Sequence, residues 1–147
     1  MKKLSETYKE LGIDFTFPIV VKDENGNLTY YESSGGYWAR HEYDKDSNEI
    51  YCEDSDDFWA CYEYDENGDE TYREDSDGSW ELSEYDKDGN ETYREDSDGS
   101  WERREYDEDG NQTYYEDSKG INRGTKRSSC SGKVVEVDGK KYKLTEL

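Results

Sequence analysis

The sequence predicts an all-β protein: an antiparallel meander of 21-residue hairpin repeats that forms an elongated twisted sheet or open solenoid, with a short N-terminal helix. Two observations lead to this fold class. Tryptophans recur every 21 residues, at Trp38, Trp59, Trp80 and Trp101. Alternating segments are separated by Asp-Gly and similar turn sequences about every ten residues. Such short spacing leaves no room for crossover helices, so neighbouring strands pair antiparallel.

The first element is a helix, expected from Ser5 to Leu11, with the serine as its N-terminal cap and Gly12 as its stop. The hairpin repeats follow directly and carry most of the acids. A basic stretch and a last hairpin end the chain. We predict four segments: helix and cap at residues 1–20, acidic repeat domain at 21–120, basic linker at 121–132 and C-terminal hairpin at 133–147.

The odd period constrains the turns, because side chains alternate between the faces of a strand. Trp80 and Trp101 share a face only if one of the turns between them has an odd number of residues. We therefore expect a three-residue loop at Lys87-Asp88-Gly89 and two-residue turns at Asp77-Gly78 and Asp98-Gly99. One face then carries Trp80, Leu82, Glu84, Thr92, Arg94, Asp96, Trp101 and Arg103. The other carries Glu81, Ser83, Tyr85, Glu91, Tyr93, Glu95, Glu102, Arg104 and Tyr106.

The C-terminal hairpin is predicted around Asp138 and Gly139, since Asp-Gly is favoured in tight turns. Its expected cross-strand pairs are Val135 with Tyr142 and Glu136 with Lys141. Residues 119–147 hold three acids and eight bases, a net charge of +5. This basic end therefore contrasts with the repeats before it.

Charge is the most unusual property of the chain. It has 147 residues with 40 acids and 19 bases, a net charge of −21, and residues 42–118 alone hold 31 acids and six bases. Such charge with low hydropathy is typical of disordered chains, but 15% aromatic residues favour an ordered fold with a thin core. An anionic surface repels nucleic acid and anionic lipid, so the favoured partner is basic. No export signal or membrane span is apparent, which predicts a cytoplasmic protein.

The repeat G-S-W-E-x-x-E-Y-D-x-x-G-N resembles the tyrosine-aspartate repeats of the Rhs and teneurin type over residues 21–120. That resemblance implies β-hairpin meanders, which wind into a shell in large parent proteins. About five units are too few to close a shell, and the density of acids departs from the family. In size, repeats and charge the chain is also similar to small acidic proteins encoded by phages and mobile elements, whose host cytoplasm would then be its location.

The regular carboxylates favour a nucleic-acid mimic. A rigid sheet with acids at fixed spacing can occupy a cleft that grips phosphates, and the interleaved aromatic rings can stack on arginine. The expected function is inhibition of a bacterial defence protein (anti-CRISPR or anti-restriction) by blocking its DNA or RNA channel. The residues predicted to contact this basic partner are Glu74, Asp75, Asp77, Trp80, Glu81, Tyr85, Glu91, Glu95, Asp96, Asp98, Trp101, Glu102 and Tyr106.

Other interpretations of the same pattern stay open. The acids can simply keep sheet edges soluble and unpaired, while an edge-to-edge homodimer is a further option. A non-catalytic protein-binding module would use its Trp and Tyr rows instead. The sequence D-K-D-G-N-E resembles the start of a calcium loop but lacks the glycine and glutamate expected later in that loop. Modules that bind choline or glucan also repeat aromatic residues about every 20 positions.

No enzyme or cofactor is expected. The carboxylates lack a predicted pocket, and no nucleophile or phosphate-loop motif is present. Cys52, Cys61 and Cys130 are expected to be free thiols. Cys52 and Cys61 are predicted to face each other across a hairpin, with His41 on the opposite face, so no zinc site is expected.

Overall fold

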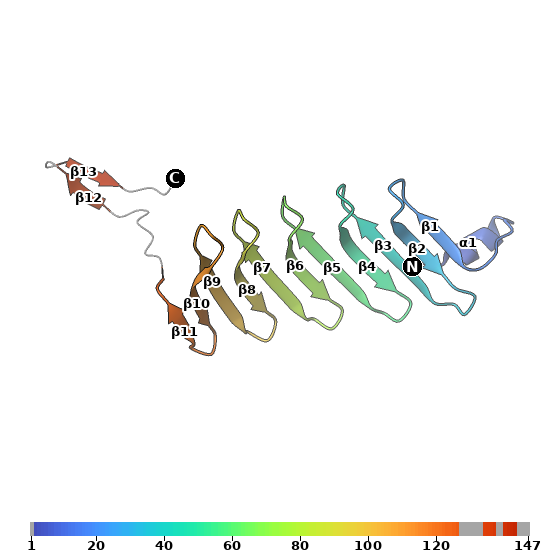
Figure 1. Ribbon diagram of the computed structural model, residues 1–147. Helices are drawn as coiled ribbons and strands as arrows, with labels where there is room; N and C mark the ends of the chain where they lie inside the picture. Colours follow the sequence, from blue (N-terminus) through green and yellow to red (C-terminus); the bar gives the residue numbers. More distant parts are fainter. Residues whose placement is uncertain (1, 127–133, 138–139, 144–147) are drawn as a thin grey trace.

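A computed structural model describes residues 2–126, 134–137 and 140–143. Eleven antiparallel strands form one open sheet in chain order, as predicted, and the repeats advance side by side along its length (Figure 1). The elements are α1 (Leu4–Glu10), β1 (Ile19–Lys22), β2 (Leu28–Glu32), β3 (Trp38–Tyr43), β4 (Glu49–Asp54), β5 (Trp59–Tyr64), β6 (Glu70–Asp75), β7 (Trp80–Tyr85), β8 (Glu91–Asp96), β9 (Trp101–Tyr106), β10 (Gln112–Asp117), β11 (Asn122–Gly124), β12 (Val134–Val137) and β13 (Lys140–Lys143).

Helix α1 ends as predicted, but it begins differently. Gly12 has a φ of 66°, the left-handed conformation that terminates a helix. The capping position is Lys3, without a side-chain cap, and Ser5 lies inside the first turn. The Ser5 backbone N–H and hydroxyl both donate to the Glu32 carboxylate, at 3.0 and 2.5 Å. Ser5 therefore anchors the helix to the sheet rather than capping it.

Every turn of the repeat domain uses the same three-residue geometry, so the predicted two-residue turns are wrong. At the β8–β9 turn, the Asp96 N–H donates to the Ser100 carbonyl and the Gly99 N–H donates to the Asp96 carbonyl, both at 3.0 Å. Gly99 has a φ of 85°, which glycine adopts without a steric cost. A type I turn followed by a left-handed residue fits the twist of a hairpin. The loop at Lys87–Gly89 is of this type, as predicted.

A bulge in each repeat restores the parity that two three-residue turns would break. Between β7 and β8 the pairing shifts beside Tyr85, so Thr92 is the extra residue. Trp80 and Trp101 consequently lie on one face, as predicted. We call this the tryptophan face, defined by Trp38, Trp59, Trp80 and Trp101, and name the other the opposite face.

From Tyr93 onward, the side chains of strand β8 lie on the faces opposite to those predicted. Leu82 pairs with Glu95, which places Glu95 and Tyr93 on the tryptophan face. Arg94 pairs with Glu102 in β9, so Arg94 and Asp96 lie on the opposite face. The error arises because the extra residue of each repeat lies in the bulge at Thr92, whereas it was predicted to lie in a turn. The pairing beyond the bulge shifts by one residue, which swaps the two faces for the side chains of β8 that follow it.

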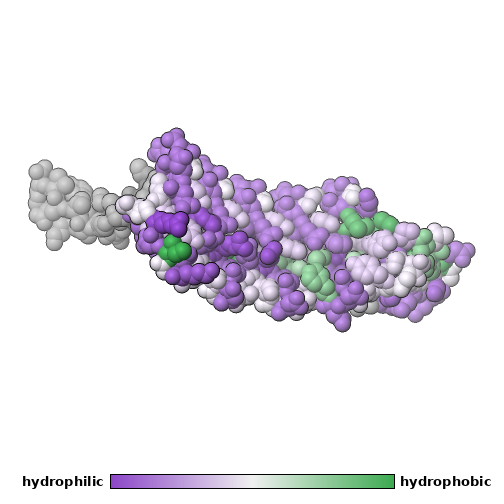
Figure 2. All heavy atoms as spheres, turned by 60° about the horizontal axis from the view of Figure 1, so that its bottom comes forward, coloured by the Kyte–Doolittle hydropathy of each residue, from purple (hydrophilic) through white to green (hydrophobic). Residues whose placement is uncertain are grey.

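The sheet has almost no core. The buried hydrophobic side chains are Ile19, Tyr30, Ala39, Ala60 and Tyr114. Hydrophilic residues cover most of the face seen in Figure 2, while hydrophobic ones gather mainly toward the N-terminal end. Backbone pairing and side-chain contacts across strands therefore carry most of the stability.

The sheet extends past the predicted boundary at residue 120. Strand β11, which was assigned to the basic linker, pairs Glu116 with Asn122 and Tyr114 with Gly124. The C-terminal strands pair Val135 with Tyr142, as predicted. Glu136 likewise pairs with Lys141. The turn predicted at residues 138–139 lies outside the described residues. Within the described ranges, no helix is long and apolar enough to cross a membrane.

Strand β11 depends on a close backbone approach at Gly124. A Cβ atom there would lie 2.0 Å from the Thr113 carbonyl oxygen, and φ is 85°. We expect Gly124→Ala to unpair β11, because the clash is with backbone that cannot rotate away. Hydrogen exchange of the Thr125 N–H, which donates to Thr113 at 3.2 Å, reports this loss. Gly110→Ala is the control: its φ is 79° with open space around it, so only about 1–2 kcal/mol of backbone strain is expected.

Candidate partner-binding surface

The predicted contact residues divide between three surfaces rather than sharing one. The prediction that Glu95 shares a face with Glu81, Glu91 and Glu102 is wrong, because the pairing of β8 shifts by one residue beyond its bulge. The tryptophan face holds Glu74, Trp80, Glu95 and Trp101. The opposite face holds Asp75, Glu81, Tyr85, Glu91, Asp96, Glu102 and Tyr106. Asp77 and Asp98 project from the turns along one edge of the sheet.

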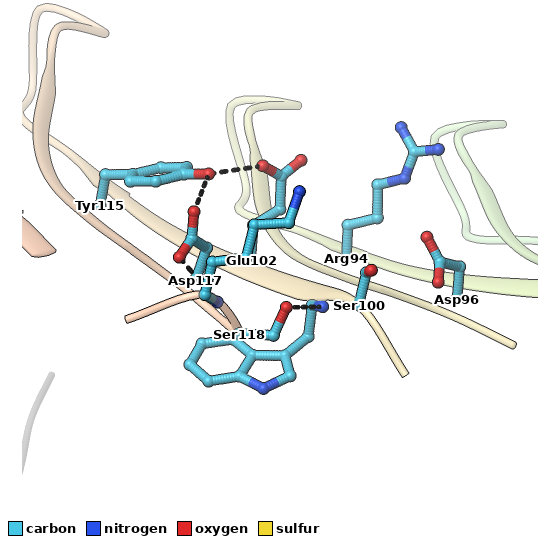
Figure 3. Close-up of a pocket in the computed structure, with 9 residues that line it drawn as sticks. Arg94, Asp96, Ser100, Glu102, Tyr115, Asp117 and Ser118 are labelled. Atoms are coloured by element: carbon cyan, nitrogen blue, oxygen red, sulfur yellow. Dashed lines mark hydrogen bonds between the residues drawn. The ribbon is translucent and has the colours of Figure 1, made fainter. Parts of the chain in front are cut away.

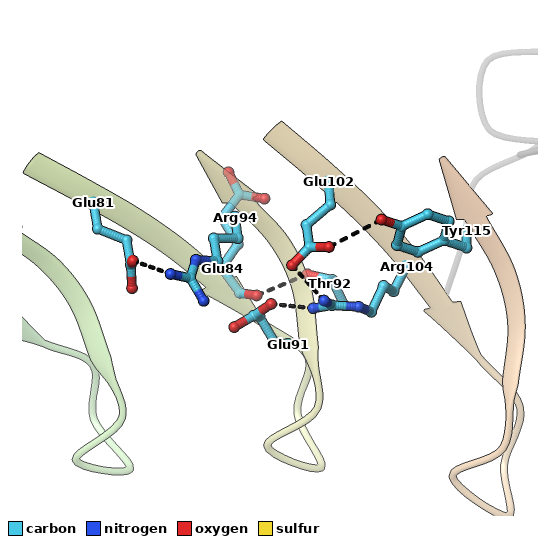
Figure 4. A network of polar contacts seen from close by, with 8 residues as sticks. All are labelled: Glu81, Glu84, Glu91, Thr92, Arg94, Glu102, Arg104 and Tyr115. Atoms are coloured by element: carbon cyan, nitrogen blue, oxygen red, sulfur yellow. Dashed lines mark hydrogen bonds and ion pairs between the residues drawn. The ribbon is translucent and has the colours of Figure 1, made fainter. Parts of the chain in front are cut away.

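On the opposite face three glutamates are already paired with arginines (Figure 4). Arg94 bonds Glu81, while Arg104 reaches both Glu91 and Glu102. The Tyr115 hydroxyl adds a bond to Glu102 at 3.1 Å. The two arginines offset part of the charge of these three glutamates, whereas Asp75 and Asp96 on the same face have no ion pair within the described residues. The predicted role of these three glutamates in binding a cationic partner is therefore weakened.

The same face has a small hollow of about 180 Å³ between β8, β9 and β10 (Figure 3). The Tyr115 hydroxyl bridges Glu102 and Asp117 at 3.1 and 3.2 Å. The Ser118 hydroxyl accepts the backbone N–H of Trp101 at 3.2 Å. Arg94 and Asp96 complete the rim. These groups hold neighbouring strands together, so the hollow is part of the sheet's own cross-strand bonding.

Aspartates stabilise the turns along both long edges of the sheet. In most turns the first residue is an aspartate that accepts backbone N–H groups of its own turn; Asp86 accepts those of Asp88 and Asn90 at 2.9 and 3.0 Å. In Asp44 the N–H and side-chain amide of Asn48 lower the pKa of the carboxyl. These bonds favour the anionic form, so Asp44 stays charged in mild acid.

One turn holds two interacting carboxylates. Hydrogen bonds from the Ser100 hydroxyl, from Asp96 and from the Ser100 backbone N–H lower the pKa of Asp98 to about 2. Asp98 in turn raises the pKa of Asp96, chiefly through their hydrogen bond. Asp98 itself is exposed. It therefore presents a charge that persists across the physiological range.

On the tryptophan face a structural unit recurs that the sequence reasoning missed. A tyrosine hydroxyl donates to a glutamate two residues later, and that glutamate lies opposite a tryptophan on the next strand. We call this the Tyr–Glu–Trp unit. Its Tyr–Glu bonds are Tyr30–Glu32, Tyr51–Glu53, Tyr72–Glu74, Tyr93–Glu95 and Tyr114–Glu116, at 3.1, 3.3, 3.0, 2.8 and 2.7 Å. The fifth unit lacks the tryptophan, because Glu116 lies opposite Asn122. The paired positions are Glu32–Trp38, Glu53–Trp59, Glu74–Trp80 and Glu95–Trp101. The signal in the sequence is Tyr-x-Glu at a period of 21.

The cysteine and histidine predictions need correction. The three-residue turn pairs Cys52 with Ala60 and Tyr51 with Cys61, so the two thiols lie on different faces. His41 pairs with Cys52 and therefore shares its face. Its Nδ1 lies 2.9 Å from a carboxylate oxygen of Glu49. Among the residues that the structure describes, no three potential metal ligands gather in one place.

Comparisons with known proteins bear on the fold. No protein-family model and no curated protein matches the chain. The chain is similar to the crystal structure of TcdB2-TccC3-TEV, an Rhs/YD-repeat toxin complex, with a TM-score of 0.52 and 14% sequence identity. The match covers 80% of this chain and only 6% of that one. This likeness agrees with a meander of tyrosine-aspartate hairpins and concerns architecture alone.

Proposed function

We propose that this protein binds a basic, nucleic-acid-binding protein and blocks its DNA or RNA channel. Charge density carries the proposal. Residues 42–118 have a net charge of −25 and include strands β4 to β10. Seven strands at about 4.8 Å each extend about 34 Å, which gives roughly one net charge per 1.4 Å. Duplex DNA carries one per about 1.7 Å, so the sheet can compete for a cleft that grips phosphates.

The exposed turn aspartates are the groups best suited to this role. Asp56, Asp77 and Asp98 occupy equivalent turn positions along one edge, two strands apart. No ion pair holds them within the described residues, whereas arginines hold Glu81, Glu91 and Glu102 on the opposite face. Bacterial defence nucleases, both restriction enzymes and CRISPR effectors, are the targets that we would test first.

The test is inhibition of DNA cleavage by a purified restriction endonuclease and a purified CRISPR effector. The triple variant Asp56→Lys, Asp77→Lys and Asp98→Lys is expected to weaken inhibition by roughly 100-fold or more, because six charge units are lost at one edge. Lys119 already occupies the same turn position before β11, so lysine suits this geometry.

The neutral triple variant, with asparagine at the three positions, is the graded control and should lose about half of that effect on a logarithmic scale. Inhibition that survives the lysine variant unchanged would refute the decoy. So would failure of the unaltered chain to inhibit nucleases of either class.

A second candidate is a plain protein-binding module that uses the tryptophan face. The repeated Tyr–Glu–Trp units favour it, because half-buried rings are effective anchors at interfaces. In that case Trp80→Ala and Trp101→Ala would reduce binding more than the edge variants do, and salt would have little effect. An edge-to-edge homodimer also stays a prediction, since β1 and β11 each pair on one side only.

A further inference from the structure

The two end units of the tryptophan face are filled by donors from the chain itself. At the C-terminal end, the Lys126 ammonium lies 3.1 Å from the Glu116 carboxylate and 5.4 Å from the centre of the Tyr114 ring. At the N-terminal end, Ser5 donates twice to Glu32. The unit thus accepts a cation or an N–H donor beside an aromatic ring, which is a favourable setting for lysine.

The second unit is also occupied. The Arg40 guanidinium lies 3.3 Å from the Glu53 carboxylate, on the same face. Arg40 reaches Glu42 as well. Three of the five units therefore hold a donor supplied by the protein.

The carboxylates of the two central units have no such donor within the described residues. Glu74 and Glu95 are half-buried, and each accepts only the tyrosine hydroxyl of its own unit. The Arg103 guanidinium lies 5.5 Å from the Tyr93 ring centre, about as close as Lys126 lies to Tyr114, but its ion pair is with Glu116, 3.6 Å away. Among the described residues, the Glu74 and Glu95 carboxylates thus have no cation paired with them.

We propose that the tryptophan face binds an extended basic segment of a partner protein, whose Lys or Arg side chains enter the units of Glu74 and Glu95 as Lys126 enters that of Glu116. The inference deepens the proposed function by naming the kind of segment that the partner presents. It rests on that function only for the sign of the partner's charge.

The spacing of the two open units specifies the segment. Equivalent residues of successive repeats are two strands apart, about 9.6 Å. Glu74 lies opposite Trp80, whose carbonyl accepts the N–H of Ser97, two residues beyond Glu95. This offset adds about 6.6 Å along the strand, so the units are about 12 Å apart. Every fourth residue of an extended chain, about 13 Å, matches this distance.

The test uses the full chain and two synthetic peptides of equal composition. One has three lysines separated by three glycines each, and the other has its three lysines adjacent. Calorimetry is expected to show at least about fivefold tighter binding of the spaced peptide, because only it reaches both units. The variant Glu74→Gln with Glu95→Gln should weaken that binding about tenfold, because two ion pairs are lost while the rings stay in place.

The matched control is Glu66→Gln with Glu108→Gln, which makes the same chemical change at two exposed turn positions of the other edge and should change peptide binding less than twofold. Tyr72→Phe with Tyr93→Phe keeps both carboxylates and the fold, and should give an intermediate loss. Circular dichroism verifies folding of each variant.

Equal losses in the edge and face variants, or equal affinity for the two peptides, would overturn the inference. No nuclease is present in this assay. A chain that binds the spaced peptide but inhibits no nuclease would therefore support this inference and contradict the proposed function. A chain that inhibits a nuclease but does not prefer the spaced peptide would support the proposed function and contradict this inference.

Discussion

Replacing Glu32 by alanine is expected to detach helix α1 and to lower the free energy of unfolding of this end of the sheet by about 3 kcal/mol. Glu32 is only 1% exposed and accepts the Ser5 N–H, the Ser5 hydroxyl and the Tyr30 hydroxyl. Its removal leaves three buried donors without an acceptor. Burial raises the pKa of Glu32, but the bonds from Ser5 and Tyr30 outweigh it, so the pKa is lowered.

Hydrogen exchange is the appropriate measurement, because a repeat array can open locally. The Leu11 N–H, which donates to Thr7, should exchange roughly 100-fold faster in the variant. Glu53→Ala is the matched control from the next repeat: its side chain is 24% exposed, so the cost should stay below about 1 kcal/mol. Similar effects at the two positions would show that Glu32 does not anchor the helix.

The lowered pKa of Glu32 also determines how the attachment of α1 depends on pH. A carboxyl whose pKa is lower in the folded state stabilises the fold above its unfolded pKa, and this contribution is lost as pH falls through the folded value. Attachment of α1 should therefore persist at neutral pH and weaken only in acid below the ordinary glutamate range.

Alkaline pH is expected to unfold the sheet between pH 10 and 12. Burial, followed by the proximity of Cys52 and Glu49, raises the pKa of Tyr62 from 10 to about 12. Burial likewise raises the pKa of Tyr64 and Tyr85. A tyrosine whose pKa is raised in the folded state contributes stability that is complete below pH 10 and is lost as pH rises through the folded value. Many tyrosines shift in the same direction, so the losses accumulate.

Tyrosinate absorbance and circular dichroism measured together test this expectation. The two signals should change together above pH 10, and Tyr62→Phe should shift the transition upward because one ionising group is removed. Cys52→Ser controls for the thiol, whose pKa is also raised by burial. Tyrosines that ionise with an ordinary pKa of 10 while the sheet stays folded would contradict the account.

The fold was predictable because its signals are local and repeated. A turn sequence every ten residues and a 21-residue period sufficed for the meander and for the shared face of Trp80 and Trp101. Which side chains share a face was not predictable. A bulge at Thr92 combined with a three-residue turn at Asp98 gives the same 21-residue period as a two-residue turn without that bulge. The observed combination places Glu95 on the other face. Spacing alone does not reveal where the odd residue lies.

Which acids and rings contact a partner stays a prediction. The ion pairs of Arg94 and Arg104 could not be foreseen, since they depend on which face each side chain of β8 occupies. The Tyr-x-Glu repeat was visible in the sequence. Its meaning required the pairing of Glu74 with Trp80 on the neighbouring strand.

The most direct test of the proposed decoy is its affinity for an inhibited nuclease, measured over a range of salt concentrations with labelled duplex DNA as competitor. A sheet that replaces phosphates should show a linear fall of log affinity with log salt, about 0.9 for each cationic contact, and should exclude DNA completely. An affinity that ignores salt, or a ternary complex of nuclease, DNA and this chain, would contradict it.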